Sequence, residues 1–288
     1  MTLKDSKIDI KFSVIIPYYQ QKAALVKGLG ALFEQDYNGE IEILVVYHPG
    51  EEHIDQLKND YPSIKWVIND QRPNPYISRN IGAREATGIY LCFMDSSCFP
   101  QPNWLTELDS YIVHNPRVQA LAGKIEVVPH SDALKDQAHG VLYLNNKKNI
   151  ERKYGVPAGH LIILKSVFEQ YGGFKTEIIS GNDIVFTRRL LEEDIHIHYV
   201  HSAVVEYPGH GYDELKTKMS KYAGGVAYHN KRSLKGSIYG FLPMRLGLFN
   251  ENLQYRELND LGRIKKIRLW FLVWGLKLRF NLGVMQGH

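Results

Sequence analysis

Short apolar runs alternate with helix-forming segments through the first 94 residues, and this alternation constrains the fold more than any other feature. The closely spaced Val, Ile, Leu and Phe residues of each run stop at Pro, Asn, Asp or a glycine-containing loop, as buried strands do. Strands are therefore predicted over residues 11–16, 41–47, 64–68 and 89–94, and helices over residues 22–34, 51–61 and 76–87. Repeated strand–helix units at this spacing predict an α/β fold with a Rossmann-like, mainly parallel central sheet flanked by helices.

The second half of the chain is less regular. Helices are predicted over residues 104–114, 134–145, 183–193 and 212–228, and strands over residues 118–128 and 157–164. Lys, Ser and Gly then cluster at residues 232–240, which is typical of a boundary. The sequence thus predicts a domain of residues 1–232 and a basic, aromatic-rich helical C-terminal extension of residues 233–288.

Polar loops follow each of the four N-terminal strands. In open parallel sheets, ligands bind beyond the carboxyl ends of the strands. The loops at residues 17–20, 47–50, 69–73 and 95–97 are therefore expected to line one crevice.

Composition and charge limit the partners and the compartment that can be expected. A formal net charge of +4 gives no reason to expect a nucleic-acid partner. The first ten residues are polar, and no apolar run approaches the roughly 20 residues of a membrane span. With only Cys92 and Cys98, the chain is expected in a reducing compartment, the cytoplasm.

Residues 78–95 read Ser-Arg-Asn-Ile-Gly-Ala-Arg-Glu-Ala-Thr-Gly-Ile-Tyr-Leu-Cys-Phe-Met-Asp. This stretch resembles the inverting family 2 glycosyltransferases, in which an Arg-Asn-x-Gly helix leads into a strand that ends in Asp-x-Asp. Residues 12–19 are similar to the family's first strand and nucleotide-binding loop. Residues 158–174 resemble its acceptor-side strand and Gly-Gly-Phe turn, and residues 181–190 resemble the helix that carries its Glu-Asp pair. The four segments come in the family's order and span residues 11–231.

The resemblance implies a GT-A fold and transfer of a sugar, of the hexosyltransferase type, from a nucleotide diphosphate donor to a hydroxyl acceptor with inversion. Asp183 is the expected general base, because inversion needs a carboxylate that takes the acceptor's proton, and a helix N-terminus favours its ionised form. The acceptor is expected to be a glycan or a lipid-linked saccharide. A role in polysaccharide biosynthesis for the cell envelope follows, in the cytoplasm and at the inner face of the membrane, with a homo-oligomer as a possible state.

The same resemblance implies two groups of binding residues. Asp95 is also expected to hold a divalent cation, Mg²⁺ or Mn²⁺, on the donor diphosphate. The expected acceptor or diphosphate residues are Asn182, Arg188 and His210, and only one of the neighbouring Arg188 and Arg189 is expected to act there. The expected donor-binding residues are Pro17, Tyr19, His48, Asn69, Arg79, Asn80, Asp95, Ser96 and Ser97.

Three positions depart from the family pattern, all on the donor and metal side. Ser97 replaces the second Asp of Asp-x-Asp, and a hydroxyl is a weaker ligand for a hard cation. The acidic residue that usually contacts the nucleotide base corresponds to Tyr47 or His48. The histidine often found in the later strand falls near residues 206–207, where His210 or Glu206 stands as a substitute.

Several interpretations of these departures stay open. Asp95, donor oxygens and water could together hold the cation, or a cationic side chain such as Arg72, Arg79 or Lys153 could replace it. The donor could carry a base other than uracil. The chain could also be a catalytically impaired subunit that binds a nucleotide sugar and partners another transferase. A nucleotidyltransferase is disfavoured, because no Gly-rich phosphate loop follows the first strand.

Residues 264–280 form an apolar, aromatic segment with basic residues near both ends. The basic residues scatter on a helical wheel, so the helix is expected to be weakly amphipathic. Contact with a membrane surface and packing against the catalytic domain or a second subunit are both compatible with this pattern.

Overall fold

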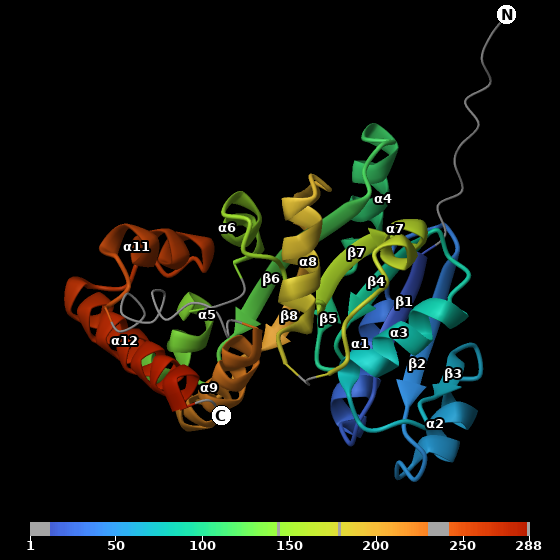
Figure 1. Cartoon of the computed structure of the whole chain (residues 1–288), viewed down its shortest axis with the longest axis horizontal. Coiled ribbons are helices and arrows are strands. Elements are labelled where there is room, and N and C mark those ends of the chain that lie inside the picture. Colours follow the sequence, from blue (N-terminus) through green and yellow to red (C-terminus); the bar gives the residue numbers. More distant parts are fainter. Residues whose placement is uncertain (1–11, 143–144, 178–179, 230–241, 287–288) are drawn as a thin grey trace, which may run out of the picture.

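The computed structural model describes residues 12–142, 145–177, 180–229 and 242–286. Its centre is an eight-stranded sheet in the order β3-β2-β1-β4-β7-β6-β8-β5 (Figure 1). The predicted α/β fold with a mainly parallel sheet is confirmed, because only β5 and β7 run against the other strands. The strands are β1 (Phe12–Pro17), β2 (Ile41–Tyr47), β3 (Lys65–Ile68), β4 (Tyr90–Met94), β5 (Phe99–Pro100), β6 (Ala120–Val128), β7 (His160–Leu164) and β8 (Ile197–Pro208).

Helices cover both faces of this sheet, and the side-chain alternation of each strand divides the core into two layers. In β1, Val14 and Ile16 belong to the first layer, and Ile15 belongs to the second. The first layer lies under α1 (Lys22–Phe33), α2 (Ile54–Asp60) and α4 (Trp104–His114). The second lies under α3 (Pro75–Glu85), α7 (Lys165–Gln170) and α8 (Asn182–Glu192).

Gly82 shows why α3 sits so close to the sheet. A Cβ atom at this position would lie 2.5 Å from Cγ2 of Ile15 and 3.1 Å from Cγ2 of Val46. The glycine of the Arg-Asn-x-Gly motif therefore lets the helix backbone approach β1 and β2. That approach places the preceding Arg79 at the edge of the sheet.

A third core joins the C-terminal extension to the rest of the chain. Leu269, Val273 and Leu276 of α12 (Arg263–Gln286) are fully buried against side chains of α5 (Ala138–Leu142), α9 (Tyr212–His229) and α11 (Leu246–Tyr255). In Figure 1 these helices form a group beside the end of the sheet that carries β6 and β8. The boundary predicted at residue 232 lies outside the described residues.

The single helix predicted over residues 134–145 is wrong. The chain forms a 3₁₀ turn over Leu134–Gln137 and the short α5, and a separate helix, α6 (Asn146–Glu151), begins beyond. Asn145 starts α6, because its side chain accepts a hydrogen bond from the backbone N–H of Lys148 at 3.1 Å. Such an N-cap favours a new helix over continuation of the old one.

No helix in residues 12–142, 145–177, 180–229 and 242–286 combines the length and the apolar character needed to cross a bilayer.

His160, at the start of β7, is fully buried in the sheet. Its Nε2 accepts a hydrogen bond from Nε1 of Trp104 at 2.7 Å, so this nitrogen must be unprotonated. Burial lowers the pKa of His160 to about 3. Burial and the charge of nearby basic groups lower the pKa of His139, on α5, to about 3 as well.

These two histidines predict a loss of stability in acid. Between pH 6.5 and 3 the unfolded chain binds protons that the folded chain excludes, so stability rises with pH in this window and falls as the pH drops. At pH 5 each histidine should lower the free energy of unfolding by about 2 kcal/mol relative to pH 7. The measurement is the free energy of unfolding in urea as a function of pH. Its slope for His160→Gln should be lower than that of the wild type by about one bound proton. His196→Gln, at an exposed position, should have the slope of the wild type. Equal pH dependence of the three proteins would contradict the assignment.

Candidate active site

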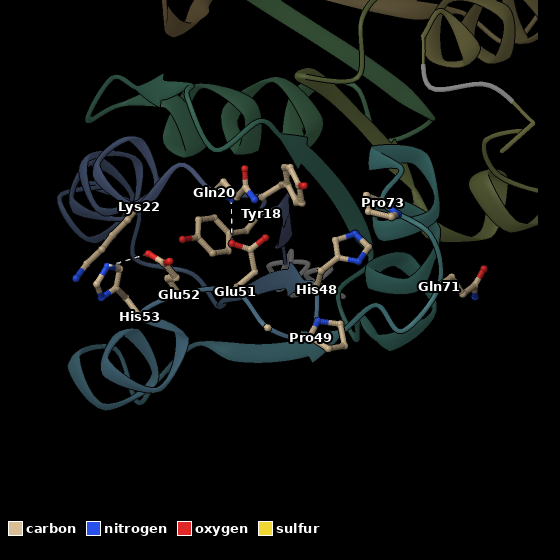
Figure 2. Close-up of a pocket in the computed structure, with 12 residues that line it drawn as sticks. Tyr18, Gln20, Lys22, His48, Pro49, Glu51, Glu52, His53, Gln71 and Pro73 are labelled. Carbon is tan, nitrogen blue, oxygen red and sulfur yellow. Dashed lines mark hydrogen bonds and ion pairs between the residues drawn. The ribbon is translucent and has the colours of Figure 1, made fainter.

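Three of the four loops at the carboxyl edge of the sheet line a cleft of about 750 Å³ (Figure 2). They follow β1, β2 and β3, as expected from the strand order. The fourth loop, residues 95–97, does not line this cleft, which corrects the prediction that all four share it. It lies alongside, because Oγ of the buried Ser96 is 3.4 Å from Oε1 of Gln21, at the start of α1.

His48, rather than Tyr47, faces the cleft. Its Nε2 lies 3.2 Å from Nδ2 of the buried Asn69, which also donates to Oγ of Ser78 at 3.0 Å. The ring of Tyr19 meets the His48 ring edge-on at 6.0 Å. Tyr47 instead packs in the first core layer, so three of the predicted donor residues, Tyr19, His48 and Asn69, come together.

Glu51 is a cleft residue that the sequence did not reveal. Its Oε2 accepts the backbone N–H of Gln20 at 3.0 Å, and Figure 2 shows the side chain extending toward that loop. Burial together with the Glu51 charge raises the pKa of Tyr18. A carboxylate therefore stands in the cleft four residues after the end of β2. The site thus retains an acidic side chain, although Tyr47 and His48 occupy the positions where the family pattern has one.

A second group of residues lies beyond this cleft and connects two distant aspartates. Arg79, buried on α3, makes an ion pair with Asp95, which follows β4. The Arg79 guanidinium also lies over the ring of Tyr76, with Cζ 5.4 Å from its centroid. The Tyr76 hydroxyl donates a hydrogen bond of 2.8 Å to Oδ1 of Asp183 on α8. Asp95 and Asp183, 88 positions apart in the sequence (183 − 95), are thereby joined through two side chains.

Both aspartates flank the backbone of residues 158–159. The N–H of Ala158 donates to Oδ2 of Asp183 at 2.9 Å. On the other side, a Cβ at Gly159 would lie 2.9 Å from Oδ2 of Asp95. Glycine is thus needed here, because any side chain would press on the Asp95 carboxylate. Asp183 itself stands in the first turn of α8, which begins after Gly181 in a left-handed conformation (φ 83°).

The surroundings of Arg79 and Tyr76 keep the first side chain protonated and charged and the second protonated and neutral. Burial lowers the pKa of Arg79, but the Asp95 charge above all outweighs it, so the pKa is raised on balance and the side chain stays cationic. Burial and the Asp183 charge raise the pKa of Tyr76, so its hydroxyl remains a hydrogen-bond donor. Oδ1 of Asp183 accepts from both the Tyr76 hydroxyl and the backbone N–H of Ile184, whereas Oδ2 accepts only from the N–H of Ala158 among the interactions of the described residues. The second lone pair of Oδ2 is therefore able to accept a further hydrogen bond.

Asn80 serves the fold instead of facing the cleft. Its amide donates to the carbonyl of Phe174 at 2.7 Å and accepts the N–H of the same residue at 3.0 Å. Asn80 therefore holds the Gly-Gly-Phe turn against α3.

The remaining predicted residues have mixed placements. Pro17 ends β1 beside Val46, Ser97 is half-buried in the loop after Asp95, and Asn182 is buried at the start of α8. Arg188 is half-buried with its Nε enclosed, whereas Arg189 is exposed and pairs with Glu193 at 2.8 Å. Arg189 is thus the solvated member of the pair.

His210 lies just before α9 and belongs to a polar cluster with side chains of that helix. Lys218 Nζ lies 2.5 Å from His210 Nε2, and Glu214 Oε1 lies 3.0 Å from Nδ1. Burial and the Lys218 charge lower the pKa of His210, so the ring is neutral near pH 7 and Lys218 carries the charge. The hydroxyl of Tyr207 is 3.1 Å from the same Nε2.

This cluster borders the aspartate group. Burial and the charges of Asp95 and Asp183 raise the pKa of Tyr222, one turn beyond Lys218, to about 12. Asp95 also contributes, with burial and Tyr222, to the raised pKa of Tyr207. Tyr222 of α9 therefore lies near both aspartates, and Lys218 precedes it by one turn of the helix.

The residues around Asp95 fit a divalent cation poorly. The Asp95 carboxylate is already paired with Arg79, and its neighbour in the motif is Ser97. No group of three His, Cys, Asp or Glu side chains that could hold a metal occurs among the described residues. A hard cation needs several oxygen ligands, and here the motif offers only the carboxylate of Asp95, which already pairs with Arg79.

Comparison with known proteins agrees with this geometry. Residues 13–172, more than half of the chain, match the sequence model of the family described as Glycosyl transferase family 2. The chain belongs to this family. The matched segment contains Arg79, Asp95 and Gly159, and Asp183 lies beyond it.

Two curated glycosyltransferases are similar to the chain, one along most of its length and one over a shorter segment. Glycosyltransferase AglE of Haloferax volcanii is 24% identical over 287 residues, which cover 94% of each chain. Amylovoran biosynthesis glycosyltransferase AmsB of Erwinia amylovora is 31% identical over 93 residues, 31% of each chain.

Solved structures show the same fold at low sequence identity. Mannosyltransferase PcManGT from Pyrobaculum calidifontis, in complex with GDP-Man and Mn²⁺, superposes with a TM-score of 0.63 at 13% identity, covering 95% of this chain and 86% of that one. S. aureus TarS 1–349 in complex with UDP superposes with a TM-score of 0.57 at 16% identity, covering 97% and 92%. These likenesses confirm the GT-A fold predicted from the sequence.

Proposed function

We propose that this family 2 glycosyltransferase moves a sugar from a nucleoside diphosphate donor to a hydroxyl of a saccharide or lipid-linked acceptor, with inversion and with Asp183 as general base. The observation that carries the proposal is the pair of carboxylates on either side of residues 158–159, one fixed by Arg79 and the other by Tyr76 and a backbone N–H.

The chemistry assigned to Asp183 is proton removal. The acceptor oxygen forms a bond to the anomeric carbon while the bond from that carbon to the diphosphate oxygen breaks. The acceptor proton passes to the carboxylate of Asp183, and the nucleoside diphosphate leaves with the bonding electrons. Hydrogen bonds from Tyr76 and Ala158 hold the carboxylate in one orientation, which favours proton transfer along a fixed path.

Asp183→Asn should therefore lower the rate of donor turnover on the order of a thousandfold, because an amide cannot take the proton. The readout is hydrolysis across UDP-, GDP-, CDP- and dTDP-sugars, in which water stands in for the acceptor hydroxyl, with thermal shift reporting donor binding. Donor binding should change by less than about twofold.

The matched control is Asp194→Asn, at an exposed residue just after α8 that pairs with Lys153. It should leave turnover intact. Full turnover by Asp183→Asn would refute the base assignment. A wild-type chain that is stabilised by a donor, yet neither hydrolyses nor transfers it, would favour the alternative, a binding subunit that partners another transferase.

The donor's base is assigned to the cleft of His48 and Glu51. The structures of similar fold hold UDP or GDP-Man, and uracil and guanine each carry ring N–H donors that a carboxylate accepts. Glu51 thus takes the place of the acidic residue that the family pattern puts at Tyr47 or His48.

Glu51→Gln should weaken binding of UDP or GDP by roughly tenfold, since a charge-assisted hydrogen bond contributes about 1.5–3 kcal/mol. Glu85→Gln is the control, because this exposed side chain pairs with Lys65 and does not line the cleft. Calorimetric titration with both nucleotides measures the effect. If Glu51→Gln binds both as tightly as the wild type, the cleft does not read the base through Glu51.

Lys218 is assigned the role of stabilising the negative charge of the leaving diphosphate. Arg79 is committed to Asp95, Arg72 donates to the carbonyl of Thr176, and Lys153 is exposed beside Asp194, so none of the cations considered from the sequence is well placed. Lys218 stands on α9 one turn before Tyr222, whose pKa is raised by burial and by the charges of Asp95 and Asp183.

Lys218→Met should lower donor hydrolysis by roughly a hundredfold, the usual cost of removing one charge-stabilising group. Lys216→Met, which removes a lysine paired with Asp213 on the same helix, should have little effect. Wild-type activity should survive EDTA. Activity that EDTA abolishes and Mn²⁺ restores, together with an unaffected Lys218→Met, would assign the charge to a metal instead.

A further inference from the structure

Helix α12 has two apolar faces on opposite sides. Leu269, Val273 and Leu276 are fully buried in the third core. On the opposite side, Ile264, Ile267, Phe271 and Leu282 are 74%, 57%, 52% and 51% exposed. At 100° per residue these four positions fall on one stripe. The weak amphipathicity expected from the sequence thus has a physical reason, because two opposed apolar faces cancel.

The preceding segment widens this exposed surface. Nε1 of Trp270 donates to the carbonyl of Met244 at 2.8 Å, and Nζ of Lys277 donates to the carbonyl of Leu242 at 2.9 Å. The segment therefore runs alongside α12, and its Leu242 and Leu246 are 55% and 65% exposed. We call the exposed side chains of Leu242, Leu246, Ile264, Ile267, Phe271 and Leu282 the α12 outer face.

The charges that α12 itself places beside its outer face have one sign. The helix contains no Asp or Glu over its 24 residues. Arg268 and Arg279 are exposed and border the apolar stripe on the helical wheel, and Arg263 and Lys265 are exposed at its first turn. An exposed apolar stripe bordered by cations is complementary to a surface that is apolar inside and anionic outside.

We propose that the α12 outer face docks on an anionic lipid bilayer, with α12 lying in the plane of the interface. Its apolar side chains would enter the boundary between headgroups and acyl chains, and its arginines would contact lipid phosphates. A second copy of the chain fits less well. A twofold dimer places the same patch on both subunits, so an acid-free basic face would meet its own charge.

Flotation of the full chain with vesicles tests this docking. Binding to vesicles of 70% phosphatidylcholine and 30% phosphatidylglycerol should exceed binding to pure phosphatidylcholine by at least about tenfold, and should weaken in high salt. The double variant Ile267→Ser/Phe271→Ser should lose at least about tenfold in partitioning. Arg268→Gln/Arg279→Gln should lose most of the preference for anionic vesicles.

Matched controls change exposed residues elsewhere. Val113→Ser/Phe33→Ser alters side chains that are 55% and 51% exposed on α4 and α1, and Arg84→Gln/Arg117→Gln removes two exposed basic residues. Both controls should bind like the wild type. The fluorescence of the wild type needs no variant, because brominated acyl chains should quench Trp270 and Trp274, which lie 5.1 and 6.2 Å from the Phe271 ring.

Three results would overturn the proposal. They are equal binding by Ile267→Ser/Phe271→Ser and the wild type, absence of quenching by brominated lipid, and a concentration-dependent dimer that the same double variant abolishes. The last result would assign the α12 outer face to a second copy of the chain. None of these results depends on the transferase activity, so the docking and the proposed function can fail separately.

Discussion

The ion pair between Arg79 and Asp95 is the interaction on which the site depends. A buried guanidinium without a partner costs on the order of several kcal/mol, so Arg79 requires Asp95, and the pair fixes the loop after β4. The cation of Arg79 also lies over Tyr76, which in turn holds Asp183. One buried charge thus orients both carboxylates, and the same commitment makes Asp95 a poor ligand for a metal.

Helix α9 connects this site to the C-terminal helices. Its Tyr222 lies near the two aspartates, while other side chains, such as Leu215 and Met219, pack in the third core with α12. The extension therefore packs against the helix that carries Tyr222. If the α12 outer face docks on lipid as proposed, α9 would lie between the membrane and the reacting groups, a suitable arrangement for a lipid-linked acceptor.

Much of the fold could be predicted from the sequence, because buried apolar runs and helical spacing determine the strands and the first helices. The loop conformations could not. Glu51 enters the cleft through a turn with left-handed residues at Gly50 and His53 (φ 82° and 64°), and neither spacing nor composition reveals that turn. Tyr76 lies three residues before Arg79, so helical spacing could have indicated that their side chains meet. The approach of Lys218 to His210 depends on the turn that enters α9, which spacing does not reveal. The structural role of Asn80 is likewise hidden in the sequence, because its hydrogen bonds to Phe174 form only in the folded chain.

A structure of the Asp183→Asn variant with an intact nucleotide sugar tests the central claim most directly. The account predicts the base beside His48 and Glu51, the diphosphate between Asp95 and Lys218, and the anomeric carbon within about 3–3.5 Å of an acceptor oxygen or water that residue 183 contacts. A sugar bound away from residues 158–159, or an anomeric carbon out of reach of any oxygen at residue 183, would contradict it.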